Sequence, residues 1–222
     1  MTEAEWLTCT GPGQMLAFLR GKASGRKLRL FACAGCRRIW HLLLDERSRQ
    51  AVEAAERFAD GEIDVVMLAS ARAAAWLVRT DAGEAAICAS APDPMMTFMY
   101  AANKAAAVAA HACLASAAWV NLMRQGWADY CDVLRDLFGN PFRRVSVPPA
   151  WLAWNGGTVR QLAMAAHEER NCSATLDATR LAVLADALEE AGCNSTELLG
   201  HLRGPGQHYR GCWGVDTLLG KS

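Results

Sequence analysis

The chain has 222 residues, of which 52% are hydrophobic and 21% are charged. This composition is typical of a globular protein, and the length suits one large domain or two small ones. The 23 basic residues equal the 23 acidic residues, whereas proteins that bind nucleic acid or anionic membranes usually carry a basic excess. We therefore expect neither partner. A net charge of zero also gives weak repulsion between copies, which favours self-association.

The sequence predicts a cytoplasmic protein that is not inserted in a membrane. Its N-terminus, MTEAEWLTCTGPG, lacks the basic start and the apolar core of a signal peptide. The most apolar window, residues 101–120, is mostly alanine and contains Lys104 and His111, so it is too weakly hydrophobic to span a bilayer. The nine cysteines are an odd number without an export signal, which is typical of reduced thiols.

Helical patterns fill the first 138 residues. Thr2 and Glu5 form a capping box at the start of the first short helix. Apolar residues recur every three or four positions in the segments that follow. The predicted helices cover 15–19, 24–44, 48–59, 62–90 with a break near 80–83, 94–125 and 127–138. Gly126 separates the last two.

The pattern changes at Gly139, where prolines, glycines and tryptophans replace the helical periodicity up to residue 157. We interpret 139–157 as an irregular or extended connector, with a short strand over 143–147. Helices are predicted again over 159–170, 178–191 and 195–202. The predicted fold is therefore all-α, a multi-helix bundle or array with this insert. Residues 1–138 form one helical domain and 158–222 a C-terminal helical lobe packed on it; the alternative is a single domain.

Three blocks of the sequence carry a resemblance to a known family. They are EAEWLTCT with MLAFLRGKASGRKLRLFACAGCRRIW, then FGNPFRRV with WLAWNGGTV, and finally RGPGQHYRGCWGVD. With these blocks the chain resembles an uncharacterised family of planctomycete bacteria over most of its length. That resemblance implies no known reaction.

A second similarity concerns residues 180–193, RLAVLADALEEAGC. This segment is similar to a short helical module that accompanies repeat domains in the same bacteria, written Leu-x-x-Ala-Asp-x-Leu-Glu-Glu. Asp186, Glu189 and Glu190 match the module, whereas Ala187 stands where it usually has tryptophan. The similarity implies a protein-interaction module and not an enzyme.

Two pairs of residues could together bind zinc. Cys33 and Cys36 form a C-x-x-C pair, and His208 and Cys212 form a second pair far along the chain. A tetrahedral zinc site often combines two such pairs. Alternatively, Cys33 and Cys36 are simply buried thiols, because their helical surroundings differ from the tight turn typical of a zinc C-x-x-C pair. A third interpretation makes them redox thiols, activated by the neighbouring arginines.

The glycine-rich loop after residue 202 is the second candidate site. Arg203, His208 and Arg210 could bind an anion or a partner there, with backbone N–H groups near the glycines as further donors. The alternative is a structural loop that Tyr209 and Trp213 hold against the helices.

These patterns contain no nucleophile constellation, cofactor fingerprint or complete metal signature, so no catalytic residue is predicted. We therefore expect a non-enzymatic cytoplasmic interaction or scaffold module, whose partner is another protein or a second copy. The competing hypothesis is a small metal- or thiol-dependent protein that uses Cys33, Cys36, His208 and Cys212 as zinc ligands or redox thiols. Zinc is the one cofactor that the sequence suggests.

Overall fold

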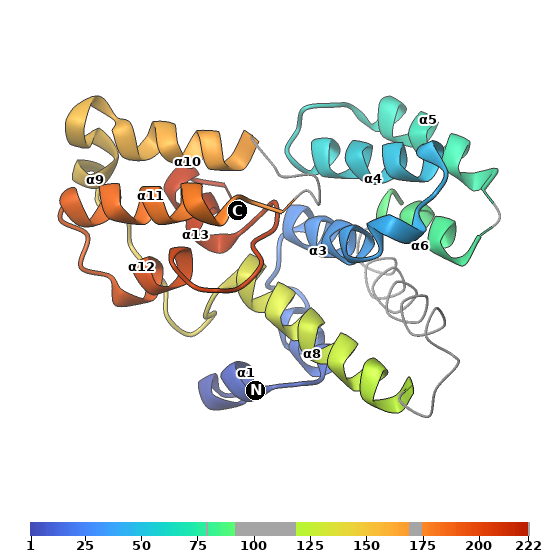
Figure 1. Ribbon diagram of the computed structural model, residues 1–222, viewed down its shortest axis with the longest axis horizontal. Helices are drawn as coiled ribbons and strands as arrows, with labels where there is room; N and C mark the ends of the chain where they lie inside the picture. Colours follow the sequence, from blue (N-terminus) through green and yellow to red (C-terminus); the bar gives the residue numbers. More distant parts are fainter. Residues whose placement is uncertain (79, 92–118, 169–174, 222) are drawn as a thin grey trace. The chain divides into compact units, whose positions relative to one another are not determined.

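A computed structural model of the chain describes residues 1–78, 80–91, 119–168 and 175–221 (Figure 1). These residues form helices and irregular segments and no β-strand, which confirms the predicted all-α class. None of the helices in these ranges is both long enough and apolar enough to cross a membrane. The chain divides into two compact units, Met1–Leu134 and Arg135–Ser222.

In its described part, unit 1 consists of helices joined by short loops and turns. They are α1 (Glu3–Thr8), α2 (Pro12–Leu19), α3 (Gly25–Arg38), the 3-10 turn η1 (Trp40–Leu42), α4 (Glu46–Ala59), α5 (Val65–Trp76), α6 (Asp81–Ala89) and most of α8 (Trp119–Phe138). Most of these helices begin at a side chain that accepts a hydrogen bond from a free backbone N–H group; these caps are Thr2, Ser24, Asp45, Asp64 and Thr80. The capping box of Thr2 and Glu5 is present as predicted.

Helices α3, α4, α5 and α6 pack against one another. The interior contains Phe31, Val52 and Ala85, all fully buried, together with one ion pair. Arg37 donates hydrogen bonds of 3.0 and 2.7 Å to the carboxylate of Glu56, and both side chains are buried. This bidentate geometry satisfies both charges inside the helical layer.

Two helix boundaries differ from those predicted. The helix predicted over 24–44 ends at Arg38 and continues as the single 3-10 turn η1. The predicted break at Gly126 is wrong, because α8 runs through it from Trp119 to Phe138. A glycine inside a helix costs only about 1 kcal/mol, which a helix of 20 residues tolerates. The predicted helix over 94–125 lies mostly outside the described residues.

Unit 2 begins with the last turn of α8. It also contains α9 (Pro149–Ala153), the 3-10 turn η2 (Trp154–Gly156), α10 (Thr158–Glu168), α11 (Ala178–Glu190), α12 (Thr196–Leu202) and α13 (Trp213–Leu219). Helices α10 and α11 lie side by side (Figure 1), and α12 and α13 pack against this pair. Their shared core includes the fully buried Val159, Leu181, Leu184 and Leu198.

The segment predicted as a connector, 139–157, falls within unit 2, which begins at Arg135. The predicted strand over 143–147 is wrong: these residues have no regular structure. Val145 and Val147 pack against the core of unit 2, but no neighbouring strand among the described residues pairs with them, and an extended segment needs such a partner to form a ladder. The packing of the C-terminal lobe on the first domain stays a prediction.

At two glycines of unit 2 the backbone lies against a neighbouring side chain, with too little room for a Cβ atom. Gly139 ends α8 with φ +61°, and a Cβ atom there would lie 2.9 Å from the indole ring of Trp213. Gly214 lies against α12, where a Cβ atom would be 3.2 Å from the imidazole of His201. Both glycines therefore bring the start of α13 against neighbouring elements of the same unit.

We predict that Gly139→Ala destabilises unit 2 through both the backbone and the indole contact. A left-handed conformation costs alanine about 1–2 kcal/mol, and forcing a methyl group into a packed site costs about 1–3 kcal/mol more. Gly192→Ala is the matched control, because Gly192 is also left-handed (φ +88°) but a Cβ atom there would meet nothing within 4 Å. Urea unfolding of both variants measures the difference; equal losses would contradict the steric contribution of Trp213.

Candidate metal centre

Four side chains with metal-binding atoms converge in unit 2. Asp136 lies in the last turn of α8 and His201 in the last turn of α12. His208 lies in the loop after α12, and Cys212 is the residue just before α13. One oxygen, two nitrogens and one sulfur, one from each residue, all lie within 4.8 Å of one another. Asp136, His208 and Cys212 are buried, and His201 is partly exposed. The four residues therefore enclose one small polar centre.

The distances around this centre are short. His208 Nδ1 lies 2.7 Å from Asp136 Oδ1, and His201 Nε2 lies 3.4 Å from the same oxygen. Cys212 Sγ is 3.1 Å from His201 Nε2 and 3.7 Å from His208 Nδ1. The two imidazole rings meet edge to face, with centroids 4.7 Å apart and an angle of 89° between their planes.

Each imidazole directs a single nitrogen to the centre. Nε2 of His201 faces both the carboxylate and the thiol, and Nδ1 of His208 faces the same two groups. In a catalytic cysteine or serine triad, the histidine uses one nitrogen for the nucleophile and the other for the carboxylate. Here ligand atoms of four different residues face one common point instead, which is the arrangement of ligands around a metal ion.

The donor set suits zinc in ligand type and in charge. Tetrahedral zinc with bonds of about 2.0–2.3 Å places its nitrogen, oxygen and sulfur ligands roughly 3.3–3.6 Å apart. The separations given above run from 2.7 to 3.7 Å, and all four atoms lie within 4.8 Å of one another. As metal ligands, one carboxylate and one thiolate would bring two negative charges, which would balance those of a divalent cation. A neutral centre avoids the high cost of burying unpaired charge.

Neighbouring groups orient the donors. The backbone N–H of Tyr209 donates to Asp136 Oδ2 over 2.8 Å, so the second carboxylate oxygen is satisfied and Oδ1 remains for the centre. The indole of Trp213 lies against the imidazole of His201, with centroids 4.9 Å apart. The backbone N–H of Leu176 donates to the carbonyl of His208 over 2.8 Å. Such supporting contacts around the ligands fix their orientation in metal sites.

Asp136 is held as a carboxylate. Burial would raise the pKa of this group, but hydrogen bonds with His201 and His208 outweigh burial and leave the pKa below its usual value. On the other side of the His208 ring, Nε2 is buried and has no hydrogen-bond partner among the described atoms. The ring is therefore oriented through Nδ1, the nitrogen that faces the centre.

The zinc site proposed from the sequence takes its residues from both units. His208 and Cys212 are joined by Asp136 and His201, whereas Cys33 and Cys36 are buried in α3 of unit 1. Burial raises the pKa of the Cys33 thiol and raises that of Cys36 to about 12. Both thiols therefore stay protonated at neutral pH, which supports the buried-thiol interpretation over the redox one.

The arginines proposed as anion ligands have partners of their own. The exposed guanidinium of Arg203 lies 2.7 Å from Asp186 and 2.5 Å from Glu189, both on α11. Arg210 is buried, as is Tyr209, which the alternative interpretation makes an anchor of the loop. Binding an anion at Arg203 would have to displace two carboxylates, so the contacts favour a structural loop. The anion site stays a prediction.

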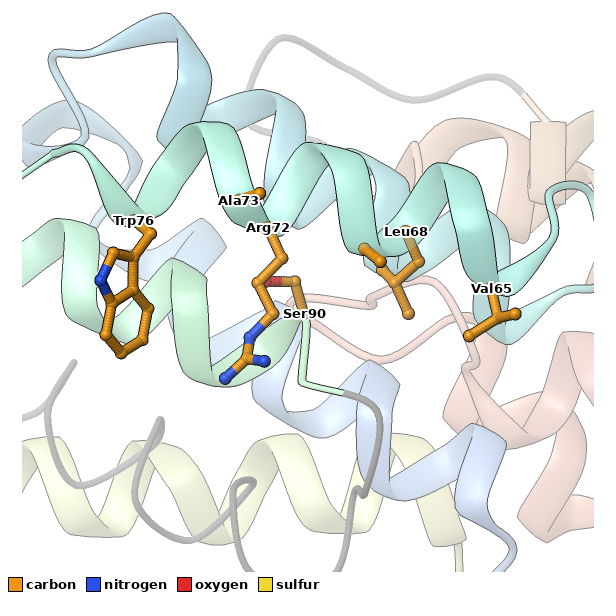
Figure 2. Close-up of a pocket in the computed structure, with 7 residues that line it drawn as sticks. Val65, Leu68, Arg72, Ala73, Trp76 and Ser90 are labelled. Atoms are coloured by element: carbon orange, nitrogen blue, oxygen red, sulfur yellow. The ribbon is translucent and has the colours of Figure 1, made fainter.

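Unit 1 presents a separate apolar surface on α5. Figure 2 shows Val65, Leu68, Arg72 and Trp76 along one side of the helix, with Ser90 opposite them. These residues line a groove of about 290 Å³. Large apolar side chains near both ends of α5 are more than half exposed: Val65, Val66, Met67, Trp76 and Leu77. Exposed apolar patches of this kind are typical of interaction surfaces.

We predict that the buried thiols of α3 resist alkylation in the folded protein. Cys9 and Cys88 are partly exposed and should react with iodoacetamide first, whereas Cys33 and Cys36 should react only in denaturant, because burial keeps them protonated and out of reach. Peptide mass spectrometry after a short native treatment reads out each site. Fast native labelling of Cys33 or Cys36 would restore the redox interpretation. Cys113 and Cys172 lie outside the described residues.

Comparison with known proteins adds no family to these observations. The chain matches no family model, no curated protein and no solved structure. The resemblance to a planctomycete family and to a repeat-companion module stays a prediction. Evidence on function therefore comes from the geometry of the chain itself.

Proposed function

We propose that unit 2 binds one zinc ion through Asp136, His201, His208 and Cys212, and that this ion stabilises the fold. The observation that carries the proposal is the convergence of four ligand atoms, from three separate elements and the loop between two of them, within 4.8 Å. Clusters of charged side chains on a protein surface are common and do not by themselves indicate a metal site. Four inward-facing donors of types O, N, N and S, three of them buried, match the ligand preferences of zinc.

Coordination number and burial support a structural role. Catalytic zinc sites keep one position open for water or substrate, whereas structural sites take four protein ligands. Asp136, His201 and His208 alone would form the two-histidine, one-carboxylate set of non-haem iron enzymes, which leaves positions open. Cys212, which is fully buried, supplies the fourth donor and closes the site.

We further propose that the chain acts as a non-enzymatic interaction module in the cytoplasm. A thiolate ligand needs a reduced cysteine, which the cytoplasm maintains. The exposed apolar residues of α5 offer a contact surface in unit 1, and equal numbers of acidic and basic residues leave little charge repulsion between copies. The similarity of residues 180–193 to an interaction module supports the same conclusion.

Metal analysis tests the zinc centre directly. Protein purified without chelator should contain about one zinc per chain, measured by elemental mass spectrometry. Cys212→Ser and His201→Gln should each lose most of it, because three remaining ligands hold zinc more weakly. Cys193→Ser is the matched control, since Cys193 is also a buried thiol of unit 2 but lies outside the group of four.

Cobalt substitution identifies the ligands. Bound cobalt(II) should show the intense visible bands of a tetrahedral site and a thiolate charge-transfer band, and Cys212→Ser should lose the charge-transfer band. A folded wild-type protein that neither contains zinc nor takes up cobalt would refute the proposal. Equal metal contents in Cys212→Ser and Cys193→Ser would refute the assignment of Cys212.

Self-association through α5 is tested by sedimentation velocity over a range of concentrations. We expect the wild type to form dimers at high concentration and Val66→Asp to weaken them strongly. Val66 is 70% exposed in the first turn of α5, where an added carboxylate suits the helix dipole, so the fold should tolerate it. Leu44→Asp is the control: Leu44 is 85% exposed in unit 1 but lies outside α5. A wild type that stays monomeric, or equal effects of both variants, would contradict this role of α5.

A further inference from the structure

The C-terminal segment Thr196–Leu219 contains only helices that are too short to be stable by themselves. Its two helices, α12 and α13, have seven residues each, and isolated helices of this length are unstable in water. The loop between them contains a series of turns and bends instead of a third helix. The segment therefore depends on contacts with the rest of unit 2 for its order.

Three of the four donors lie in this segment, and the fourth lies far from it in the sequence. His201, His208 and Cys212 are close together in the chain, whereas Asp136 belongs to α8. An ion bound by all four would join the segment to α8 as a cross-link does. Such a link removes conformational freedom from the unfolded chain, and its effect grows with the length of the loop that it closes.

The pair α10–α11 also has packing contacts of its own. These helices have 11 and 13 residues, pack directly on each other and bury Val159, Ala163, Leu181, Leu184 and Leu188. Neither helix contributes a donor to the centre. Removal of an ion from the centre therefore breaks no bond to a residue of α10 or α11.

We infer that zinc binding and the folding of residues 196–219 are one equilibrium, so that loss of the ion releases this segment while α10 and α11 stay folded. The inference rests on the proposed zinc site. Without a cation, the carboxylate, the thiol and the two imidazoles would stay buried together. Release of residues 196–219 from the rest of unit 2 would return these polar groups to water. Opening would also expose Leu198, Leu202, Val215 and Leu218, which are buried in the closed state.

Hydrogen exchange of the full-length protein measures this coupling. Samples with zinc, after chelation, and after chelation followed by zinc or magnesium addition are compared, with the metal content of each determined in parallel. Amides within 196–219 should lose at least tenfold protection on chelation, and those of 178–190 should change less than threefold. Zinc should restore the protection, and magnesium should not, because it prefers oxygen ligands.

Cleavage by trypsin gives a second measurement, which needs no substitution in the metal centre. Arg203 is exposed, whereas Arg210 is buried beside the centre. Cleavage after Arg210 should therefore require opening of the segment, and it should be slow with zinc and fast after chelation. The Cys193→Ser variant should behave as the wild type in both states.

The outcomes separate this inference from the zinc site itself. Complete removal of zinc with unchanged exchange in 196–219 would overturn the inference and leave the zinc site standing. Equal loss of protection in 178–190 and 196–219 would also overturn it, because unit 2 would then unfold as a whole. A protein that binds no zinc would overturn both.

Discussion

The carboxylate of Asp136 is the group on which the arrangement of unit 2 depends. One of its oxygens accepts the backbone N–H of Tyr209, and the other faces the nitrogens of His201 and His208. A buried carboxylate must have partners for both oxygens, because an unpaired charge away from water is costly. The partners of Asp136 come from α12 and from the loop before α13, so these contacts bring the end of α8 together with the C-terminal segment.

Much of the fold could be predicted from the sequence, because helices follow from local patterns. The capping box of Thr2 and Glu5, the break near 80–83 and the helix over 195–202 are set by side chains a few residues apart. The continuation of α8 through Gly126 could not be predicted in this way. There the cost of one glycine is small beside the packing of residues such as Tyr130 and Leu134, both buried, and packing depends on distant parts of the chain.

The candidate site was predicted only where its residues are neighbours in the sequence. His208 and Cys212 are four positions apart in a loop without an apolar pattern, and this close spacing is typical of a pair of metal ligands. His201 follows the ordinary periodicity of α12, and Asp136 resembles any acidic residue at the end of an amphipathic helix. The motif Cys33-x-x-Cys36 lies on α3 with both thiols buried, which the spacing of the two residues does not reveal. A metal site is defined by convergence in space, which spacing in the sequence reveals only for residues on one local element.

The loop between α12 and α13 is unusual in being partly buried. Loops normally lie at the surface, because their backbone groups need water as a partner. Here His208, Tyr209 and Arg210 are nearly fully buried, although the loop contributes few aliphatic side chains to the core. Polar contacts hold it in place: the backbone of Tyr209 bonds Asp136, and the carbonyl of His208 accepts from Leu176. Hydrogen bonds contribute modestly to stability when both partners can return to water. An ion at the proposed zinc site would be coordinated by two residues of this loop region, His208 and Cys212, and would add a stronger attraction to these hydrogen bonds.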